Sequence, residues 1–482
     1  MGDIIKIFVF VLCSFLSFGQ IKFYNVYTNN GSDKGQGVLQ MEDSSYYITG
    51  SSSSFSGSSQ AFLMHVDSMG NYLWSNHYGG AESESGRRVL YKKNFGFFIS
   101  GFTNSYGSGG FDYYLAKIDE AGDLEWEKAY GGTGWERVHD AALTKDTGVI
   151  MVGETSSNLT DNQDIYIVRT NKLGDTLWTK TIGGLGDDYA SCIKGFTDST
   201  FVIAGRTYVE DSSLTKIYIT YIKDNGTVIW TDTLGQNGNY WANGISFDGT
   251  RIIGIGGIQA DYTDGTDLVA FIYDISGFSW GESKIYAEGE QEYDGIITLD
   301  GGNNYYTCYS NEDANSYVNG PDVIMAKYTQ PFSWLNSFRI GYQNPDVNGQ
   351  IINTNDGGAI VVGYSTGLFA GGNEVYLVKI GPNDDYPSSI TDLVIDELVT
   401  LKEEEIVGLK IYPNPSNEKV NVVFDSEKYS DLRMINSVGS EVYFTEFHKN
   451  TSIDVSQLQS GIYFIEITGT EVIPFRRQIV VN

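Results

Sequence analysis

The chain has 482 residues, with 57 glycines, 8 prolines and 14% aromatic residues, a composition typical of a folded, strand-rich protein. Its length predicts two or three domains. The 61 acidic residues outnumber the 31 basic ones, which gives a net charge of −30. A surface this acidic repels phosphate backbones and anionic lipids, so it excludes nucleic acid as an expected partner and favours cations, basic peptides or neutral sugars.

Residues 1–19 predict a signal peptide. Lys6 precedes the apolar run 7–12, and Ser17-Phe18-Gly19 provides small residues for cleavage. The apolar run is too short to cross a membrane, and no later stretch reaches 18 apolar residues, so no membrane span is expected. Three cysteines are too few for a disulfide framework.

A repeat of about 50 residues dominates the next 360 positions. Tryptophans recur at 74, 126, 178, 230, 280 and 334, and turn glycines precede them at 70, 122, 174, 226 and 277. Further glycines keep the same spacing at 50, 101, 153, 205, 256 and 363, with Cys308 between the last two. Each unit contains four short apolar runs separated by turn residues, which is typical of four antiparallel strands. Seven such units predict an all-β fold, a seven-bladed β-propeller over residues 20–381.

The two ends of the repeat region complement each other. Only six units contain the tryptophan strand, and the seventh stops after its third strand near Ile380. Residues 21–27 match the tryptophan strand of the first unit, with Phe23 in the place of Trp74 and Tyr27 in the place of Tyr78. We therefore expect the N-terminal strand to complete the seventh blade, because an open ring would leave two unpaired sheet edges.

Residues 382–407 are polar and acidic and predict a linker. A compact β pattern follows over 408–482, with alternating apolar positions typical of a small Ig-like β-sandwich. Three motifs occur there in order: Tyr412-Pro413-Asn414-Pro415, a turn ending at Gly439, and Gly461-Ile462-Tyr463.

In these motifs the last 75 or so residues resemble the type A C-terminal sorting domain of the type IX secretion system of Bacteroidota. One departure is Arg476-Arg477, where such domains often carry Lys. The resemblance implies export through the periplasm, with the type IX translocon and its sorting-domain shuttle as partners. It also implies cleavage near the linker and a final location outside the cell or on its outer surface.

Acidic residues recur ten positions after the aromatic anchor of each fourth strand, in the loops that lead into the next blade. They are Asp33, Glu84, Glu136 and Asp188, joined by Glu292 and Asp346 if a two-residue shift is allowed, while Tyr240 occupies the remaining position. Trp135 and Trp241 lie in the same loops. Carboxylates beside aromatic rings predict a carbohydrate or peptide site. The alternative is that each acid accepts hydrogen bonds inside its own loop.

Other loops on this face differ from blade to blade, which is where function is usually carried. Asp261, Asp264 and Asp267 supply hard oxygen ligands suited to Ca²⁺, although their spacing does not match an EF-hand, and a solvated turn is the alternative. No other cofactor is expected.

Evidence for catalysis is sparse. The four histidines fall in predicted strands or in the C-terminal domain, and no nucleophile or metal motif occurs. The sequence therefore predicts an exported binding or adhesion protein, with no catalytic residue assigned. The alternatives are a polysaccharide-active hydrolase or lyase and a purely structural surface component.

Overall fold

The computed structural model describes residues 22–28, 31–54, 58–157, 162–249, 251–259, 266–275, 279–285, 291–299, 304–312, 322–329, 332–340, 345–366, 372–381, 391–394, 409–412, 416, 418–424, 430–436, 441–447, 450–469 and 472–481. These residues form strands and connecting turns, and none of them is helical. The predicted all-β class is confirmed.

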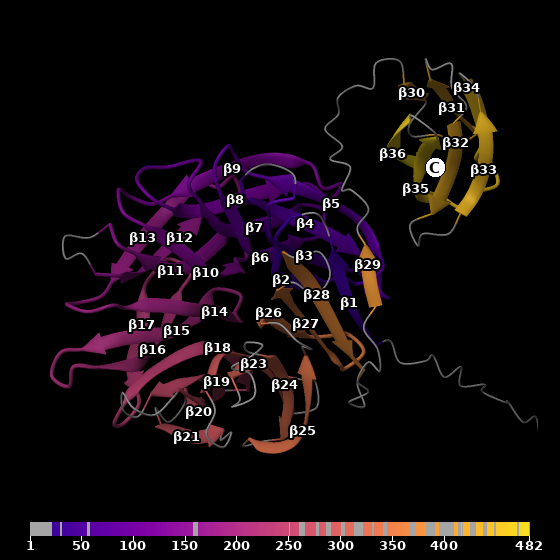
Figure 1. Ribbon diagram of the computed structural model, residues 1–482. Coiled ribbons are helices and arrows are strands. Elements are labelled where there is room, and N and C mark those ends of the chain that lie inside the picture. Colours follow the sequence, from indigo (N-terminus) through magenta and orange to yellow (C-terminus); the bar gives the residue numbers. More distant parts are fainter. Residues whose placement is uncertain are drawn as a thin grey trace, which may run out of the picture.

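Between residues 22 and 381 the described strands build seven four-stranded antiparallel sheets, the blades of a β-propeller (Figure 1). Blades 1 to 3 comprise β2 (Asp33–Gln40), β3 (Tyr46–Ser52), β4 (Gln60–Val66) and β5 (Tyr72–Tyr78); β6 (Glu84–Lys92), β7 (Gly96–Thr103), β8 (Asp112–Ile118) and β9 (Leu124–Tyr130); and β10 (Glu136–Leu143), β11 (Val149–Thr155), β12 (Asp164–Thr170) and β13 (Thr176–Ile182).

Blades 4 to 6 follow the same order. They comprise β14 (Tyr189–Thr197), β15 (Thr200–Val209), β16 (Leu214–Lys223) and β17 (Val228–Leu234); β18 (Asn239–Asp248), β19 (Arg251–Gln259), β20 (Asp267–Asp274) and β21 (Ser279–Ile285); and β22 (Gln291–Leu299), β23 (Asn304–Glu312), β24 (Asp322–Thr329) and β25 (Ser333–Ile340).

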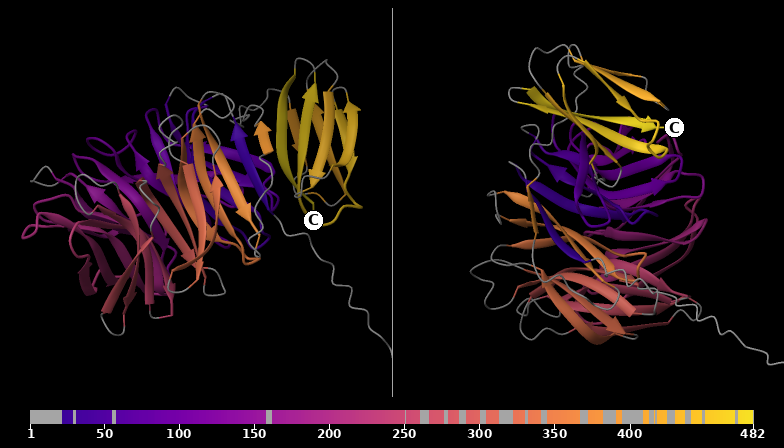
Figure 2. Two further views of the ribbon diagram at one scale, coloured as in Figure 1. Left: turned by 60° about the horizontal axis from the view of Figure 1, so that its bottom comes forward. Right: turned by 90° about the vertical axis from the view of Figure 1, so that its right-hand side faces the viewer.

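Blade 7 joins the two ends of the repeat region. It contains β26 (Asp346–Asn353), β27 (Ala359–Thr366), β28 (Asn373–Ile380) and, as its fourth strand, β1 (Phe23–Thr28). The first strands of successive blades contact one another around the ring, and β2 contacts β26, so the ring closes. Figure 2 shows β1, in indigo, beside the orange strands of this blade. The predicted closure by the N-terminal strand is confirmed.

The register of β1 is also the one predicted. The hydroxyl of Tyr27 donates to the carbonyl oxygen of Gly70 at 2.7 Å, and that of Tyr78 donates to Gly122 at 2.8 Å in the next blade. The outer strands β1 and β5 thus each use a tyrosine to hold a turn of the following blade. Phe23 lies against Gly70 as Trp74 lies against Gly122.

Burial follows position within a blade. The third strand β8 is buried along its whole length, whereas the outer strand β13 alternates between exposed and half-buried residues. Third strands are therefore almost wholly apolar, because each is covered on both faces, and outer strands alternate with period two.

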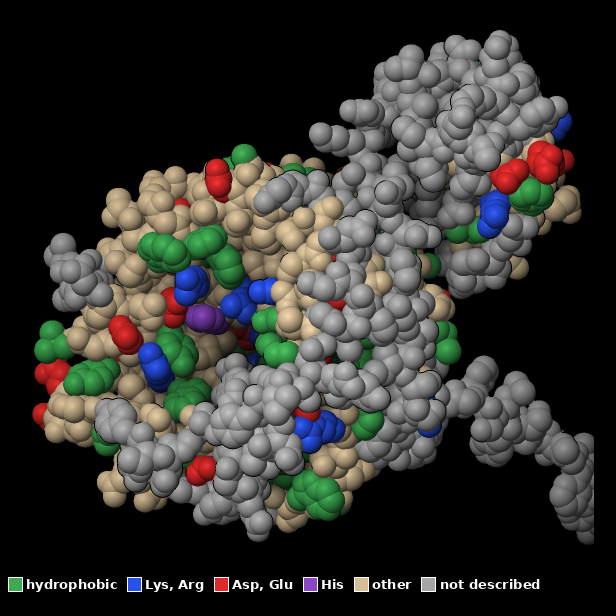
Figure 3. Space-filling view, viewed as in Figure 1, with side chains coloured by type: hydrophobic (Ala, Val, Ile, Leu, Met, Phe, Trp, Pro, Cys, Tyr) green, Lys and Arg blue, Asp and Glu red, His purple; other side chains and the backbone are tan. Residues whose placement is uncertain are grey.

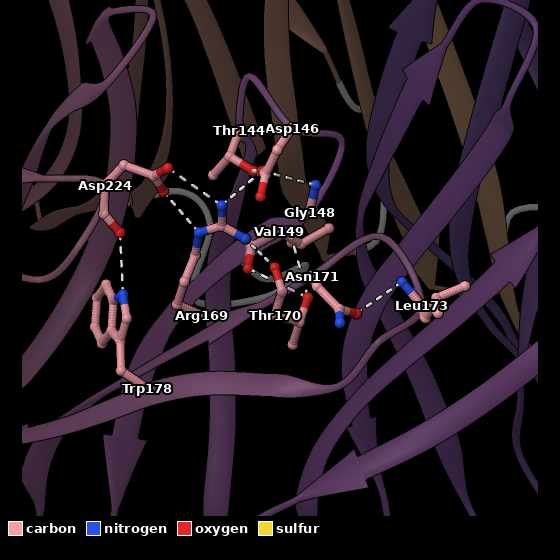
Figure 4. Close-up of polar contacts among 10 residues, drawn as sticks. All are labelled: Thr144, Asp146, Gly148, Val149, Arg169, Thr170, Asn171, Leu173, Trp178 and Asp224. Carbon is pink, nitrogen blue, oxygen red and sulfur yellow. Dashed lines mark hydrogen bonds and ion pairs between the residues drawn. The ribbon is translucent and has the colours of Figure 1, made fainter.

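Buried cations reinforce the side of the ring opposite the inter-blade loops. Arg169 of β12 is 1% exposed, and its guanidinium contacts Asp224 and Asp146, each at 2.6 Å (Figure 4). The indole nitrogen of Trp178 donates to the carbonyl oxygen of Asp224 at 3.0 Å. Because this buried charge is fully paired, it ties blades 3 and 4 together at the turns.

Two findings concern the region after the propeller. Residues 391–394, placed in the linker by the sequence, form β29 (Thr391–Val394), which pairs parallel with β1. The C-terminal strands are β30 (Leu409–Tyr412), β31 (Lys419–Phe424), β32 (Ser430–Asn436), β33 (Glu441–Phe447), β34 (Asn450–Asp454), β35 (Gly461–Gly469) and β36 (Val472–Val481). They form two sheets around one apolar core, a small β-sandwich as predicted.

Candidate functional site

The innermost strand of each blade is interrupted at the same place. In each of the seven described inner strands the pairing with the second strand shifts two to four residues after the strand begins. A bulge leaves its extra residue outside the ladder and re-aims its side chain. The propeller therefore presents a ring of residues whose backbones lie outside the strand pairing.

These bulge residues border a central cavity of about 610 Å³. They differ from blade to blade, and those that line the cavity are Gln36, Arg87, His139, Ser191, Asn243 and Gly349. Figure 3 shows basic side chains and a histidine grouped with hydrophobic ones in the middle of this face. A repeated backbone thus displays a non-repeated set of polar groups, as a specific site requires.

Three cations lie over aromatic rings in or beside the wall of this cavity: Lys34 lines it, Arg206 lies over the lining residue Tyr189, and Arg137 lies over Trp135. The ammonium of Lys34 is 5.1 Å from the ring centroid of Tyr364, and the guanidinium of Arg206 is 4.4 Å from that of Tyr189. Arg137 lies 5.2 Å from the ring of Trp135. All three cations are half-buried. Such contacts fix the orientation of a cation without neutralising it.

His139 and Glu154 form a contact within the cavity wall. The Nε2 atom of His139 lies 3.4 Å from Oε2 of Glu154, whose side chain is 9% exposed. Burial is the largest single effect on Glu154 and raises its pKa, but the contact with His139 and the charges of Arg137 and Arg206 together bring the pKa below its usual value. The carboxylate is therefore ionised, and it is the acid of this local group of cations.

Two uncharged groups in the cavity wall lack partners. The hydroxyl of Ser191 and the amide nitrogen of Asn243 are buried and make no hydrogen bond with the described residues. Buried polar groups in folded proteins are nearly always paired. These two are therefore available to a ligand that enters the cavity.

The acids predicted from the repeat are hydrogen-bonded within their own loops, and of them Glu84 also lines the cavity. Glu136 is 0% exposed and accepts hydrogen bonds from Thr155, Ser157 and the backbone of Gly132. Glu84 accepts equivalent bonds from Thr103 and from the backbone of Gly80. These contacts agree with the alternative interpretation, in which each acid accepts hydrogen bonds inside its own loop.

The same arrangement holds at two further blades. The carboxylate of Asp188 accepts hydrogen bonds from the backbones of Tyr208 and Gly184, and that of Asp33 accepts one from the hydroxyl of Ser54. Burial raises the pKa of both acids.

Asp346 departs from this pattern. It is 0% exposed, and neither carboxylate oxygen has a hydrogen-bond partner among the described residues. Burial raises its pKa to about 7, an effect that nearby Ser365 lowers and Asp322 increases. At pH values below 7 this acid is held in its neutral form.

The predicted aromatic residues have different environments. Trp135 is 49% exposed and packs edge-on against Phe111, which lines the cavity. Tyr240 is 2% exposed beneath Lys216. The ring of Trp241 lies where a β-carbon on Gly257 would be, so it rests flat on the second strand of blade 5.

Several predicted residues fall outside the description or at its edge. Glu292 lies on β22, but its side chain is not described, and Asp261 and Asp264 lie outside the described residues. Asp267 begins β20. Where the chain is described, no cluster of three or more His, Cys, Asp or Glu could hold a metal ion. The Ca²⁺ site thus stays a prediction.

The predicted sorting motif is described in part. Tyr412 ends β30 and is half exposed, Gly461 begins β35, and the buried Tyr463 donates its hydroxyl proton to the carbonyl oxygen of Gln459 at 2.8 Å. Pro413, Asn414, Pro415 and Gly439 lie outside the described residues.

The bulge residues were missed by reasoning from the sequence. The available signal was their variability at one fixed position, three residues after each acid, within strands that otherwise repeat. Small residues flank that position in several blades, as Gly35 and Gly37 do around Gln36. Glycine is common at bulges because they need close backbone approach.

Comparison with known proteins identifies the C-terminal part of the chain. Residues 410–482 match the family model described as the secretion system C-terminal sorting domain. The sorting domain directs type IX secretion to the cell surface or outside the cell. No helix among the described residues is long and apolar enough to cross a membrane.

The propeller has more distant likenesses. A search of curated proteins found no match. Among solved structures, a puromycin hydrolase is similar over 81% of this chain and 58% of its own, with a TM-score of 0.46 and 11% identity. The polysaccharide lyase Uly1 is similar over 72% of this chain and 90% of its own, with a TM-score of 0.43 and 9% identity.

An α-L-arabinanase of Penicillium chrysogenum is similar over 66% of this chain and 93% of its own, with a TM-score of 0.36 and 12% identity. The chain spans 58% of the length of the puromycin hydrolase, which is less than two thirds. Likenesses this weak carry no argument about activity.

Proposed function

We propose that this chain is an exported binding protein of a bacterium of the Bacteroidota, and that its ligand binds in the central cavity of the propeller. The observation that carries the proposal is the ring of bulge residues. Each blade repeats the same backbone irregularity, yet the bulge residues described at the cavity differ: they are Gln36, Arg87, His139, Ser191, Asn243 and Gly349. A purely structural ring would need no such variety at its axis, whereas a site for one ligand does.

The sorting domain supports the setting. It provides the route out of the cell, and the predicted signal peptide provides the first step. The propeller then supplies a rigid scaffold whose binding groups are held by strands, which keeps them in place more accurately than loops would.

A blocked cavity tests the proposal. Mature protein would first be screened on glycan and peptide arrays, and the best binder would then be titrated into wild type and Ser191→Phe. Phenylalanine at this bulge fills space in the cavity, so binding should fall at least about tenfold. Thr227→Phe is the matched control, because Thr227 is exposed in the turn between β16 and β17, away from the cavity lining. Equal binding by both variants would place the ligand elsewhere and overturn the proposal.

A second candidate, a polysaccharide-active hydrolase or lyase, is favoured by one contact. His139 and Glu154 lie 3.4 Å apart in the cavity wall, which also contains Ser191 with its unpartnered hydroxyl. A histidine held by a carboxylate can accept a proton near neutral pH. Polysaccharide breakdown by wild type that is lost in His139→Ala would support this candidate, and binding without any breakdown would remove it.

A further inference from the structure

We infer that the ligand of the central cavity is an acidic saccharide, a sugar chain that carries carboxylate or sulfate groups. The inference rests on the proposed function and names the chemical class that the cavity selects. It reverses the expectation from net charge, which favours cations, basic peptides or neutral sugars.

The first step of the argument is the state of the cations. Lys34, Arg137 and Arg206 come from blades 1, 3 and 4, and each lies over an aromatic ring. In the described part of the chain none of the three makes an ion pair or a side-chain hydrogen bond, and the Nε atom of Arg206 is buried without a partner. Half-buried cations lose hydration, so a site that keeps them unneutralised is suited to a charge partner from outside.

The second step is the balance of charge in the cavity wall. Arg88 is neutralised by Asp140 at 2.7 Å, and Arg87 donates to the amide oxygen of Gln36 at 2.8 Å. The acids in this wall are Glu84, which is 1% exposed and bonded within its own loop, and Glu154, which contacts His139. Counted over the described side chains, the open part of the cavity is therefore locally basic; the bulge of blade 6 contains Asp294, whose side chain is not described.

The third step explains why the net charge of the protein does not decide the charge of the ligand in the cavity. At physiological salt a charge is screened beyond about 8 Å. The many acidic residues on the outer surface therefore act weakly on a group inside the cavity, whereas Lys34 in the wall and Arg137 and Arg206 beside it act at short range. A protein with a net charge of −30 can thus bind an anion at this place.

The fourth step separates a saccharide from a small anion. The wall also carries uncharged hydrogen-bonding groups, which are Gln36, Ser51, Ser59, Ser83, Ser85, Ser191, Asn243 and Asn348. Phe102, Phe111, Tyr189 and Tyr364 add aromatic surface. Amides, hydroxyls and ring faces match the hydroxyls and apolar faces of sugar rings, and the cavity of about 610 Å³ is large for a lone anion.

Calorimetric titration at physiological salt tests the inference with defined probes. The full mature chain would be titrated with a chondroitin sulfate hexasaccharide, with a galacturonate hexasaccharide and with maltohexaose. We expect at least one acidic probe to bind and the neutral probe to bind at least about tenfold more weakly, since each charged hydrogen bond contributes about a factor of ten. The two acidic probes separate sulfate from carboxylate as the preferred group.

Two variants attribute the binding to the cavity. The first is a triple variant, Lys34→Gln with Arg137→Gln and Arg206→Gln. Its affinity for the acidic probe should fall by about a hundredfold or more. The matched control removes three exposed cations elsewhere, with Lys93→Gln, Lys145→Gln and Lys172→Gln, and should leave the affinity unchanged.

If the triple cavity variant melts below wild type, Asn243→Asp provides the second test. This near-isosteric change adds a negative charge to the cavity wall and should lower the affinity for the acidic probe by about tenfold.

The outcomes separate this inference from the proposed function. If maltohexaose binds as tightly as the acidic probes, or the triple variant binds them as wild type does, the inference is overturned. Loss of maltohexaose binding in Ser191→Phe would then still support a cavity ligand. If no saccharide binds, the inference also fails, and the array experiment alone decides the proposed function.

Discussion

Asp112 and Glu136 place two carboxylates beside the same backbone glycine at the junction of blades 2 and 3. A β-carbon added to Gly131 would overlap Oδ1 of Asp112 and Oε2 of Glu136, so both oxygens lie close to one point. Oδ1 of Asp112 has no hydrogen-bond partner among the described residues. Burial, against the hydrogen bond from the backbone of Ser108 and with a smaller contribution from the charge of Glu136, raises the pKa of Asp112 to about 6.

This shift predicts a pH-dependent stability. A raised pKa means that the folded state binds more protons than the unfolded state between 3.8 and about 6. The free energy of unfolding therefore falls as the pH rises through this window and stays lower above it. Asp112→Asn should remove this loss, because the amide can still accept from the backbone of Ser108 and can donate to Glu136.

The measurement is a set of thermal melts from pH 4 to pH 8. Asp112→Asn should be more stable than wild type at pH 8 by about 1 to 3 kcal/mol and equal to it near pH 4. The chain itself provides a precedent, since Gln60 occupies the equivalent position before Glu84 and donates to the carbonyl oxygen of Gly80. Asp211→Asn, at an exposed acid, is the control. A loss of stability at pH 8 would instead indicate that the two carboxylates hold a cation.

At the scale of elements, the contact between an outer strand and the next blade depends on a glycine turn. Gly122 has φ +93°, and a β-carbon there would lie 2.7 Å from the ring of Trp74. Gly122→Ala therefore introduces both backbone strain and a clash, and should cost about 2 to 4 kcal/mol of unfolding free energy.

Two glycines separate these causes. Gly249 has φ +60° with open space around it, so Gly249→Ala reports strain alone, at about 1 kcal/mol. Gly184 has neither feature, and Gly184→Ala should lie within about 0.5 kcal/mol of wild type. Chemical denaturation of the three variants provides the comparison. If Gly122→Ala costs no more than Gly249→Ala, the tryptophan contact does not hold the blades together.

The sequence predicted the elements well and the direction of their side chains poorly. The spacing of tryptophans and turn glycines locates every blade, because each blade needs the same turn and the same inter-blade contact. The acids repeat for the same reason, since Glu84 and Glu136 each close their own loop. The bulge side chains proposed to bind the ligand were missed because a bulge decides which residue faces the axis, and the residue type at that position, such as His139, does not repeat from blade to blade.

At the scale of the whole molecule, the ring depends on its N-terminal strand. β1 pairs with β28 and carries Tyr27, whose hydroxyl holds the turn at Gly70. Deleting residues 20–30 would expose the edge of blade 7 and remove this contact with blade 1. We expect the deletion to lower the melting temperature of the whole propeller by more than about 10 °C, because a closed ring unfolds cooperatively. Scanning calorimetry that shows an unchanged transition would contradict the closure.

Charge also differs between scales in this protein. Counted over the chain it is strongly negative, yet Lys34, Arg137 and Arg206 leave the rim of one cavity basic. Composition could predict the first property and not the second, because local charge depends on how many cations the fold gathers around each carboxylate, as around Glu154.

A crystal structure of the mature chain with an acidic hexasaccharide tests the central claim most directly. The account predicts the sugar in the central cavity, against the bulge residues Gln36, Ser191 and Asn243, with its anionic groups directed at Lys34, Arg137 and Arg206. A sugar bound on the outer strands or at the opposite end of the ring, with the cavity empty, would contradict it.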